Sequence, residues 1–294
     1  MKKLFLVLNP IAGVRQARRV LTEMADLFTR AGYLVTVYPT ASRGDAFSFA
    51  AAYGGQADLL VACGGDGTLN ETVSGLLSAG LKTPIGYLPA GSTNDFASGL
   101  NLPTNLMKAC EQIIEGAPHP LDIGLFGESR YFCYTASFGA FTEVATSTPQ
   151  NVKNLLGHAA YILQGIRSLA DIRPLHLKIT ADGETHEGAF IFGAICNSTS
   201  LGGILKLEKD QVHMNDGLFE SLLIPFPADL IVLNQMISAL SARRWDDPRL
   251  IFLRASSFVM EGDPLLPWTL DGEEAAGAPL LTVRNLPGAV RLVY

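Results

Sequence analysis

An apolar run that ends in a cluster of glycines constrains this chain most. Residues 59–63 read Leu-Leu-Val-Ala-Cys and pass directly into Gly-Gly-Asp-Gly-Thr at positions 64–68. A short run that is apolar at every position is typical of a parallel strand covered by helices on both faces. Glycines adopt positive φ angles and let a backbone approach a ligand, so successive N–H groups can point at phosphate oxygens. The segment therefore predicts a buried strand that opens into a phosphate-binding turn.

Asp66 is the unusual residue of this turn. A carboxylate is repelled by a polyphosphate unless a divalent cation lies between them. The turn therefore predicts a bound nucleotide together with Mg²⁺.

Composition limits the class of protein. The chain has 294 residues, of which 48% are hydrophobic, a size that favours two domains over one. The chain has 22 Lys and Arg and 28 Asp and Glu, and its basic residues are not clustered in the sequence. This composition disfavours a nucleic-acid partner. The four cysteines are isolated in apolar stretches, as expected of buried thiols in a reducing cytosol. No segment is long and apolar enough to span a bilayer, and a signal peptide is not expected.

The first 125 residues alternate between strand and helix patterns, which predicts an α/β domain with a layered sheet. The expected strands cover residues 4–8, 33–38, 59–63 and 85–88, and the expected helices cover 14–28, 47–53, 69–77 and 106–114.

The pattern changes after about residue 125. A helix is expected over 152–170, but short strands separated by turn signals predominate from residue 175 onward. The expected second domain, 126–285, is therefore a mostly-β sandwich, with residues 286–294 as a candidate return to the first domain. Its expected strands cover 131–137, 175–180, 189–196, 218–224, 251–260, 280–284 and 289–293, with a helix near 230–240.

Three more loops belong with the glycine turn, because each follows a predicted strand. They are Asn9-Pro10-Ile11-Ala12-Gly13, the loop that Thr40 opens, and residues 89–96. The carboxyl ends of parallel strands share one edge of a sheet, where ligands bind. We therefore expect these loops and the glycine turn to meet at one site.

Several other nucleotide and catalytic motifs are absent. A dinucleotide fingerprint fails because Asn70 stands where its third glycine belongs, and there is no GxxxxGK[ST] sequence. Gly91-Ser92-Thr93 lacks the pattern around a hydrolase serine, and the histidines lack metal-ligand spacing.

Together these motifs carry a family resemblance. Asn9-Pro10-x-Ala12-Gly13, then Gly64-Gly65-Asp66-Gly67-Thr68, then Gly91-Ser92-Thr93-Asn94-Asp95 resemble the bacterial diacylglycerol kinase-like soluble lipid kinases, which are similar to sphingosine and ceramide kinases. NAD kinases and phosphofructokinases share the glycine turn, whereas the last motif points to the lipid branch.

The resemblance implies an ATP site in the cleft between an α/β nucleotide domain and a β-sandwich lipid domain. Asp66 and Asp95 are expected to hold or orient Mg²⁺ and the γ-phosphoryl group. The residues implied in binding ATP are Asn9, Pro10, Ile11, Ala12, Gly13, Thr40, Gly64, Gly65, Asp66, Gly67, Thr68, Leu69, Asn70, Glu71, Gly91, Ser92 and Thr93.

The resemblance also implies a late Asp-Gly-Glu triplet whose glutamate accepts the proton of the lipid hydroxyl. The chain has two such triplets, at 182–184 and 271–273. The first lies among polar residues and is better explained as a hairpin turn. We therefore expect Glu273 to be the base, with Asp271 as a supporting carboxylate.

A second, structural Mg²⁺ is implied beside Asp216-Gly217. Asp216 would bind it directly, the carbonyls of His213 and Leu218 would complete the site, and Asp122 would link it to the active centre. A plain β-turn explains the Asp-Gly pair nearly as well.

The expected function is an ATP-dependent lipid kinase that phosphorylates diacylglycerol or a related lipid, cytoplasmic and peripheral at the membrane surface. A soluble-substrate kinase related to NAD kinases and a catalytically inactive nucleotide- and lipid-binding regulator are the alternatives. A homodimer is left open.

Overall fold

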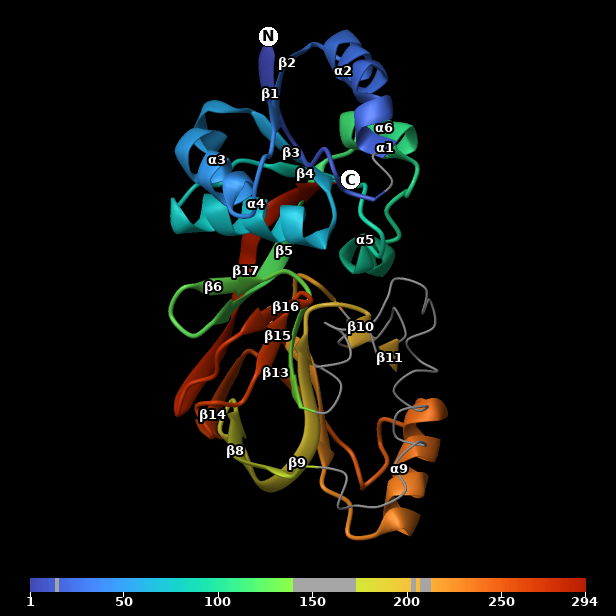
Figure 1. Ribbon diagram of the computed structural model, residues 1–294, viewed down its shortest axis with the longest axis vertical. Helices are drawn as coiled ribbons and strands as arrows, with labels where there is room; N and C mark the ends of the chain where they lie inside the picture. Colours follow the sequence, from blue (N-terminus) through green and yellow to red (C-terminus); the bar gives the residue numbers. More distant parts are fainter. Residues whose placement is uncertain (14–15, 140–172, 202–204, 207–212) are drawn as a thin grey trace. The chain divides into compact units, whose positions relative to one another are not determined.

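The computed structural model describes residues 1–13, 16–139, 173–201, 205–206 and 213–294 (Figure 1). The helix expected over 152–170 lies outside these residues. The chain divides into two compact units. Unit 1 consists of Met1–Ile123 with Leu286–Tyr294, and unit 2 consists of Gly124–Asn285.

Unit 1 is built on a parallel sheet. Its strands lie in the order β17-β4-β3-β1-β2, and every neighbouring pair in this order is parallel. Their bounds are β1 Lys2–Leu8, β2 Tyr33–Pro39, β3 Leu59–Gly64, β4 Ile85–Pro89 and β17 Leu280–Val293, of which the last residues belong here.

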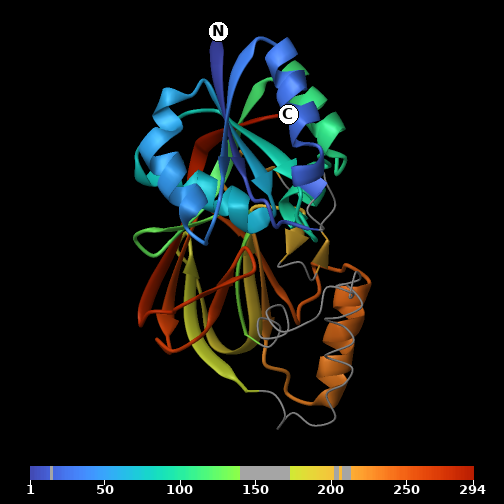
Figure 2. The same cartoon turned by 45° about the horizontal axis from the view of Figure 1, so that its top comes forward.

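Helices cover both faces of this sheet (Figures 1 and 2). Helices α2 and α6 pack together on one face, and α3 and α4 pack together on the other. The α/β architecture is therefore confirmed. The helices are α1 Gln16–Arg19, α2 Leu21–Arg30, α3 Asp45–Tyr53, α4 Asp66–Ser78, α5 Asp95–Leu100 and α6 Leu106–Glu115, with a short 3₁₀ helix at Gly54–Gln56.

Buried cysteines contribute to the core of unit 1. Cys63 on β3 and Cys110 on α6 are fully buried beside Leu6 and Phe28. Burial raises the pKa of the Cys110 thiol to about 12, so it stays protonated at neutral pH. All four cysteines of the chain are free and buried, which confirms the expectation that they act as small hydrophobic residues.

Unit 2 is a mostly antiparallel β-sandwich, as expected. Neighbouring strands in the path β16-β15-β7-β9-β8-β14-β17 are antiparallel, while β12 joins β9 to β13 and β5 joins β17 to β6. The strands are β5 Pro118–Phe126, which begins in unit 1, β6 Arg130–Phe132, β7 Thr135–Gly139, β8 Leu175–Ala181, β9 Glu184–Cys196, β10 Ser200–Leu201, β11 Leu205–Lys206, β12 Phe219–Pro225, β13 Ile251–Ala255, β14 Ser257–Gly262, β15 Trp268–Leu270 and β16 Glu273–Ala275.

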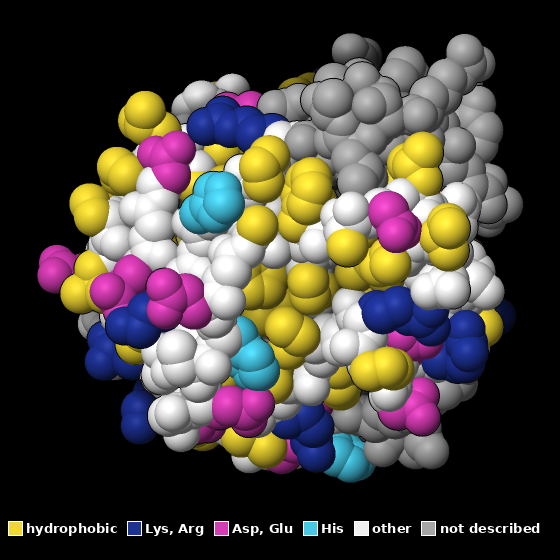
Figure 3. Space-filling model, turned by 90° about the horizontal axis from the view of Figure 1, so that it is seen from below, with side chains coloured by type: hydrophobic (Ala, Val, Ile, Leu, Met, Phe, Trp, Pro, Cys, Tyr) yellow, Lys and Arg dark blue, Asp and Glu magenta, His cyan; other side chains and the backbone are white. Residues whose placement is uncertain are grey.

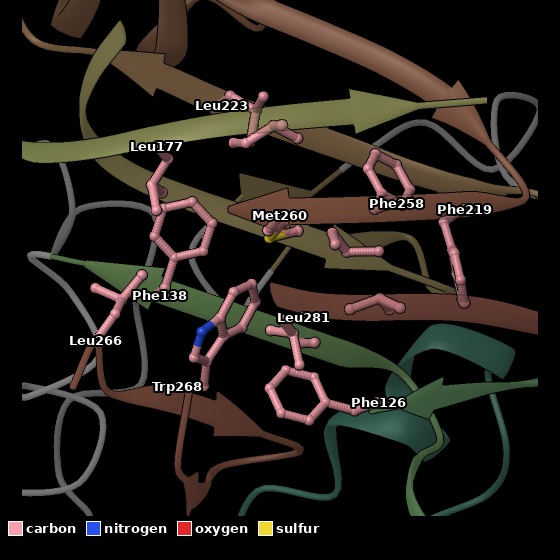
Figure 4. Close-up of a cluster of buried hydrophobic side chains, with 14 of the residues drawn as sticks. Phe126, Phe138, Leu177, Phe219, Leu223, Phe258, Met260, Leu266, Trp268 and Leu281 are labelled. Carbon is pink, nitrogen blue, oxygen red and sulfur yellow. The ribbon is translucent and has the colours of Figure 1, made fainter. Parts of the chain in front are cut away.

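Two hydrophobic clusters stabilise unit 2. In the larger one Trp268 packs against Phe126 and Phe138, with ring centroids 5.1 and 4.7 Å away (Figure 4). The other cluster lies where α9 (Leu230–Ser241) packs on β9 and β12. Burial of these side chains is the main source of folding free energy, at about 25 cal/mol per Å² of apolar surface.

The structure contains strands that were not expected, among them β5, β15 and β16, and it divides or joins expected strands at three places. Residues 251–260 form two strands, because the N–H and hydroxyl of Ser256 bond to Asp182 instead of continuing one ladder. Residues 280–293 form one strand rather than two. Residues 131–137 are divided between β6 and β7 at Cys133 and Tyr134.

The surface shows no block of positive charge on the face drawn in Figure 3, where Lys and Arg stand among Asp and Glu around a central group of hydrophobic side chains. Within the part of the chain that the structure describes, no helix is long and apolar enough to cross a membrane.

Candidate active site

The predicted loops meet at one edge of the unit 1 sheet. Hydrogen bonds join each loop to the neighbouring strand end: Asn9 N donates to Cys63 O at 2.8 Å, Thr40 N to Leu8 O at 2.9 Å, and Ala90 N to Gly64 O at 2.8 Å. Because the strands are parallel, these loops all leave the same edge. The convergence expected from the sequence is therefore present within unit 1.

Close backbone approach explains the glycines of these loops. A Cβ atom on Gly91 would lie 2.5 Å from Cα of Gly65, and one on Gly13 would lie 2.6 Å from the carbonyl oxygen of Ala90. Gly13 also has a φ of +54°. Side chains at these positions would push the loops apart.

Helix α4 begins at Asp66, directly after the contact between Gly65 and Gly91. The partial positive charge of its N-terminus and the N–H groups of its first turn therefore face this loop cluster, as an anion site requires. Thr68 accepts a hydrogen bond from Asn9 Nδ2 at 3.3 Å, which fixes the first loop to the helix. The side chain of Leu69 is buried in the core and its N–H donates to the Gly65 carbonyl at 3.2 Å, so its contact with ATP stays a prediction.

The structure brings Asp66 and Asp95 together. The carboxylate of Asp66 accepts the N–H of Asp95 at 3.0 Å and that of Phe96 at 3.2 Å, and so holds the start of α5. Asp66 therefore has a visible positioning role, which the sequence did not indicate. Its role toward Mg²⁺, and that of Asp95, stay predictions.

Asn94 is a positioning residue that sequence reasoning missed. Its side chain accepts the Gly91 N–H and donates to the Gly91 carbonyl, both at 2.9 Å, and it is buried. This pair of bonds closes the loop and leaves Ser92 and Thr93 exposed, with hydroxyls accessible to a ligand. Asn94 adopts the αL conformation, with a φ of 52°, which asparagine tolerates better than most residues, so the asparagine after Gly91-Ser92-Thr93 was the signal in the sequence.

Other predicted ATP-binding residues have structural partners as well. Glu71 accepts the N–H groups of Gly44 and Ala46, at 2.8 and 3.2 Å, and so fixes the N-terminus of α3. The Thr40 hydroxyl donates to the Leu8 carbonyl at 3.4 Å. A direct contact of either residue with ATP stays a prediction. Among the remaining predicted residues, Pro10, Gly67 and Asn70 are half-buried, Ala12 is buried, and Ile11 is 73% exposed.

In unit 2, Asp271 and Gly272 form the turn between β15 and β16. Both have positive φ, 49° and 84°, which is the hairpin geometry that an Asp-Gly pair favours. The Asp271 carboxylate is 6% exposed and accepts three N–H groups, from Cys133 at 2.6 Å and from Tyr134 and Thr135 at 3.0 Å. Asp271 therefore ties the hairpin to the start of β7, and Glu273, half-buried, is the first residue of β16.

Asp182 and Gly183 form a second hairpin turn, between β8 and β9, with φ angles of 43° and 98°. The exposed Asp182 carboxylate accepts the N–H groups of Ser256 and Ser257, at 2.7 and 3.0 Å. Glu184 is exposed and lies 2.9 Å from Nε2 of His186. The expectation of a hairpin turn here is confirmed.

The residues around Asp216 do not fit a second magnesium ion. One oxygen of Asp216 accepts the Leu218 N–H at 3.0 Å, and the other binds Arg254 at 2.7 Å, so a cation already neutralises this carboxylate. No group of three or more His, Cys, Asp or Glu side chains suited to a metal occurs among the described residues. The two partners of the Asp216 carboxylate, rather than the absence of a side-chain cluster, count against the metal expected there from the resemblance, and His213 is exposed.

Asp122 and Glu220 are two further carboxylates with buried side chains. Asp122, in unit 1, is fully buried and accepts the Gly288 N–H at 2.7 Å; its link to a metal site stays a prediction. Glu220, in unit 2, is 1% exposed and accepts a bond from Arg254 Nε at 3.1 Å. Burial raises the pKa of Glu220 to about 7, and the nearby arginine opposes this shift.

Comparison with known proteins identifies the family. Residues 3–126 match the diacylglycerol kinase catalytic domain, and residues 135–294 match the YegS C-terminal NAD kinase beta sandwich-like domain. A diacylglycerol kinase of Bacillus subtilis is 31% identical over 281 residues, which cover 95% of this chain and 92% of that relative. The chain belongs to the diacylglycerol kinase family. The family assignment makes it a lipid kinase, a transferase with a catalytic domain and a C-terminal β-sandwich domain.

Other members of the family give the same result. The diacylglycerol kinase of Staphylococcus carnosus is 32% identical over 280 residues, covering 95% of this chain and 90% of its own. A crystal structure of a diacylglycerol kinase from Bacillus anthracis aligns with a TM-score of 0.76 at 20% identity, covering 100% of this chain and 97% of that one. At that identity the structural match supports the fold alone.

Proposed function

We propose that this lipid kinase transfers the γ-phosphoryl group of ATP to a hydroxyl of diacylglycerol or a related lipid at a membrane surface. The observation that carries the proposal is the meeting of the strand-end loops around Gly13, Gly65 and Gly91, at the N-terminus of α4. The names of the similar proteins from Bacillus and Staphylococcus support diacylglycerol as the acceptor.

The loop cluster of unit 1 accounts for the binding of ATP. Its N–H groups and the dipole of α4 attract the triphosphate, and the exposed hydroxyls of Ser92 and Thr93 are available to phosphate oxygens. Asp66 and Asp95 are the carboxylates that would orient Mg²⁺; the Asp95 N–H donates to the Asp66 carboxylate, which keeps the two residues adjacent. When bound, this ion neutralises charge on the β- and γ-phosphates.

Glu273 is the proposed general base. Its carboxylate takes the proton from the lipid hydroxyl as the alcohol oxygen bonds to the γ-phosphorus, and the bond from that phosphorus to the bridging oxygen of ADP breaks. A positioned base contributes roughly 10²- to 10⁴-fold to such a reaction. Asp271 supports Glu273 by fixing the hairpin, because its carboxylate is occupied by three N–H groups of residues 133–135.

Transfer of ³²P from labelled ATP to acceptors in mixed micelles tests the proposal. The panel contains diacylglycerol, monoacylglycerol, ceramide and sphingosine, with NAD as a soluble acceptor. We expect the highest kcat/KM for a glycerolipid. Transfer to NAD alone would instead make the protein a soluble-substrate kinase, and tight binding of Mg²⁺-ATP without any transfer would make it a regulator; either result contradicts the proposal.

A variant that opens the loop cluster links this activity to the observed geometry. Gly91→Val places side-chain atoms against the backbone of Gly65 and should abolish ATP binding, as measured by calorimetry. Gly188→Val is the matched control, because Gly188 on β9 has no positive φ and an added Cβ would meet no atom within 4 Å. Equal ATP affinity in the two variants would show that ATP binds elsewhere.

A further inference from the structure

An arginine occupies the carboxylate to which the family resemblance assigns a second magnesium ion. The guanidinium of Arg254 donates to Asp216 Oδ2 at 2.7 Å through Nη2, and to Glu220 Oε1 at 3.1 Å through Nε. The second oxygen of Asp216 accepts the Leu218 N–H at 3.0 Å. Each oxygen of this carboxylate therefore has a partner supplied by the chain itself.

The position of Arg254 in the sheet explains how one side chain reaches both carboxylates. Arg254 on β13 lies directly opposite Glu220 on β12 in the antiparallel register. Asp216 lies in the turn that leads into β12, three residues before its first residue. A planar guanidinium presents several donors in a fixed fork, so it can bridge two acceptors that a lysine would contact only one at a time.

The burial of Glu220 favours a cation beside these carboxylates. Glu220 is 1% exposed, whereas Asp216 lies at the surface with a side chain that is 25% exposed. A buried carboxylate near a second one destabilises a fold unless positive charge lies beside it. A divalent ion is one way to supply that charge, and an arginine is another. Both cannot occupy the same carboxylate without strong mutual repulsion.

We infer that Arg254 takes the place of a structural divalent cation in this chain, joining the Asp216 turn to β13 so that this part of unit 2 folds without Mg²⁺. The inference concerns the Asp216 turn alone. It does not depend on the proposed phosphoryl transfer, and it leaves the Mg²⁺ that accompanies ATP unaffected.

Binding of Mn²⁺ to the nucleotide-free protein, followed by electron paramagnetic resonance, tests the inference directly. Asp216→Ala identifies any ion that belongs to this turn, whereas ions held elsewhere bind equally to the variant and the wild type. We expect identical Mn²⁺ binding by the two proteins. A site of micromolar affinity that is present in the wild type and lost in Asp216→Ala would overturn the inference.

Thermal unfolding of the same nucleotide-free protein gives a second readout. The melting temperature of the wild type should be the same in EDTA and in millimolar Mg²⁺. Arg254→Ala leaves two carboxylates without their cation, so its melting temperature should fall by roughly 5 °C or more in EDTA and recover in part with Mg²⁺. Lys178→Ala, which removes an exposed ion pair with Glu261, is the control and should show no response to Mg²⁺.

A wild-type melting temperature that falls in EDTA, together with an unchanged melting temperature in Arg254→Ala, would also overturn the inference. If Arg254→Ala does not fold, the comparison of Mn²⁺ binding between the wild type and Asp216→Ala remains decisive.

Discussion

The two Asp-Gly-Glu turns of unit 2 have the same sequence and the same backbone geometry, yet their surroundings differ. In both hairpins the aspartate and glycine have positive φ, and the aspartate accepts N–H groups from the start of a neighbouring strand. Asp271 does this in the interior, at 6% exposure, whereas Asp182 does it at the surface.

The difference teaches which residue of the triplet carries information about function. The presence of each aspartate is explained by its turn conformation and by the backbone N–H groups that it binds in a neighbouring segment. Neither aspartate therefore needs a catalytic role. Only the glutamates differ in a way that matters for chemistry. Glu184 is exposed next to His186, whereas Glu273 is half-buried on a hairpin that Asp271 fixes in place.

The largest expected difference between the two turns is in turnover. Glu273→Gln removes the proton acceptor but keeps the shape of the side chain, so kcat for lipid phosphorylation should fall roughly 10²- to 10⁴-fold while the affinity for Mg²⁺-ATP stays unchanged. Glu184→Gln makes the same chemical change at the other hairpin and should leave kcat unaltered. Equal activity of the two variants would remove the distinction between the turns.

The next difference is in stability. Asp271→Ala leaves three backbone N–H groups without their acceptor in the interior, which should lower the free energy of unfolding by about 3 kcal/mol or more. Asp182→Ala exposes its partners to water, which replaces the lost bonds, so its cost should be about 1 kcal/mol. Urea denaturation measures both free energies of unfolding. A larger loss of this free energy in Asp182→Ala than in Asp271→Ala would contradict the view that Asp271 makes the more stabilising contacts.

Another buried carboxylate sharpens the comparison, because Glu220 accepts Arg254 Nε, whereas Asp271 accepts three backbone N–H groups of residues 133–135. Its pKa is raised from 4.5 to about 7, so the folded chain binds more protons than the unfolded chain between these values. The stabilising contribution is therefore complete below about pH 4.5 and is lost as the pH rises toward 7.

Glu220→Gln should remove this pH dependence. The wild type should lose roughly 2–3 kcal/mol more unfolding free energy than the variant between about pH 5 and pH 8. Urea denaturation across that range measures the difference, and parallel pH profiles for the two proteins would show that Glu220 titrates normally.

The smallest expected effects test whether the two turns share one backbone geometry. Gly183 and Gly272 have φ angles of 98° and 84°, and an added Cβ meets no atom within 4 Å at either position. Alanine at each should therefore cost only the strain of positive φ, about 1 kcal/mol in both turns. A markedly unequal pair of unfolding free energies would show that the turns differ in more than their surroundings.

Local sequence patterns were sufficient for the elements that present the loop cluster. The apolar run at 59–63 and the glycines after it indicated both β3 and the turn, because burial and backbone freedom are properties of the segment itself. The Asp182-Gly183 hairpin was predictable for the same reason. The meeting of the other loops with this turn followed from their positions after predicted strands of a parallel sheet.

Elements that are stabilised by residues far away in the sequence could not be predicted from local sequence patterns. Helix α5 begins where the Asp66 carboxylate, 29 residues earlier in the chain, accepts its first N–H groups. The single long strand β17 passes Pro287 because Asp122 accepts the N–H of Gly288. The roles of Glu71 and Arg254 were hidden likewise, since their partners Gly44 and Asp216 lie 27 and 38 residues away.

The proposed base is tested most directly by the pH dependence of phosphoryl transfer in a single turnover. Enzyme loaded with labelled ATP is mixed with diacylglycerol micelles and quenched, which separates the chemical step from product release. We expect the rate constants of the wild type and Glu184→Gln to rise tenfold per pH unit at low pH, and the residual rate of Glu273→Gln to be flat there. A Glu273→Gln profile that keeps the acidic limb and the wild-type rate would contradict the account.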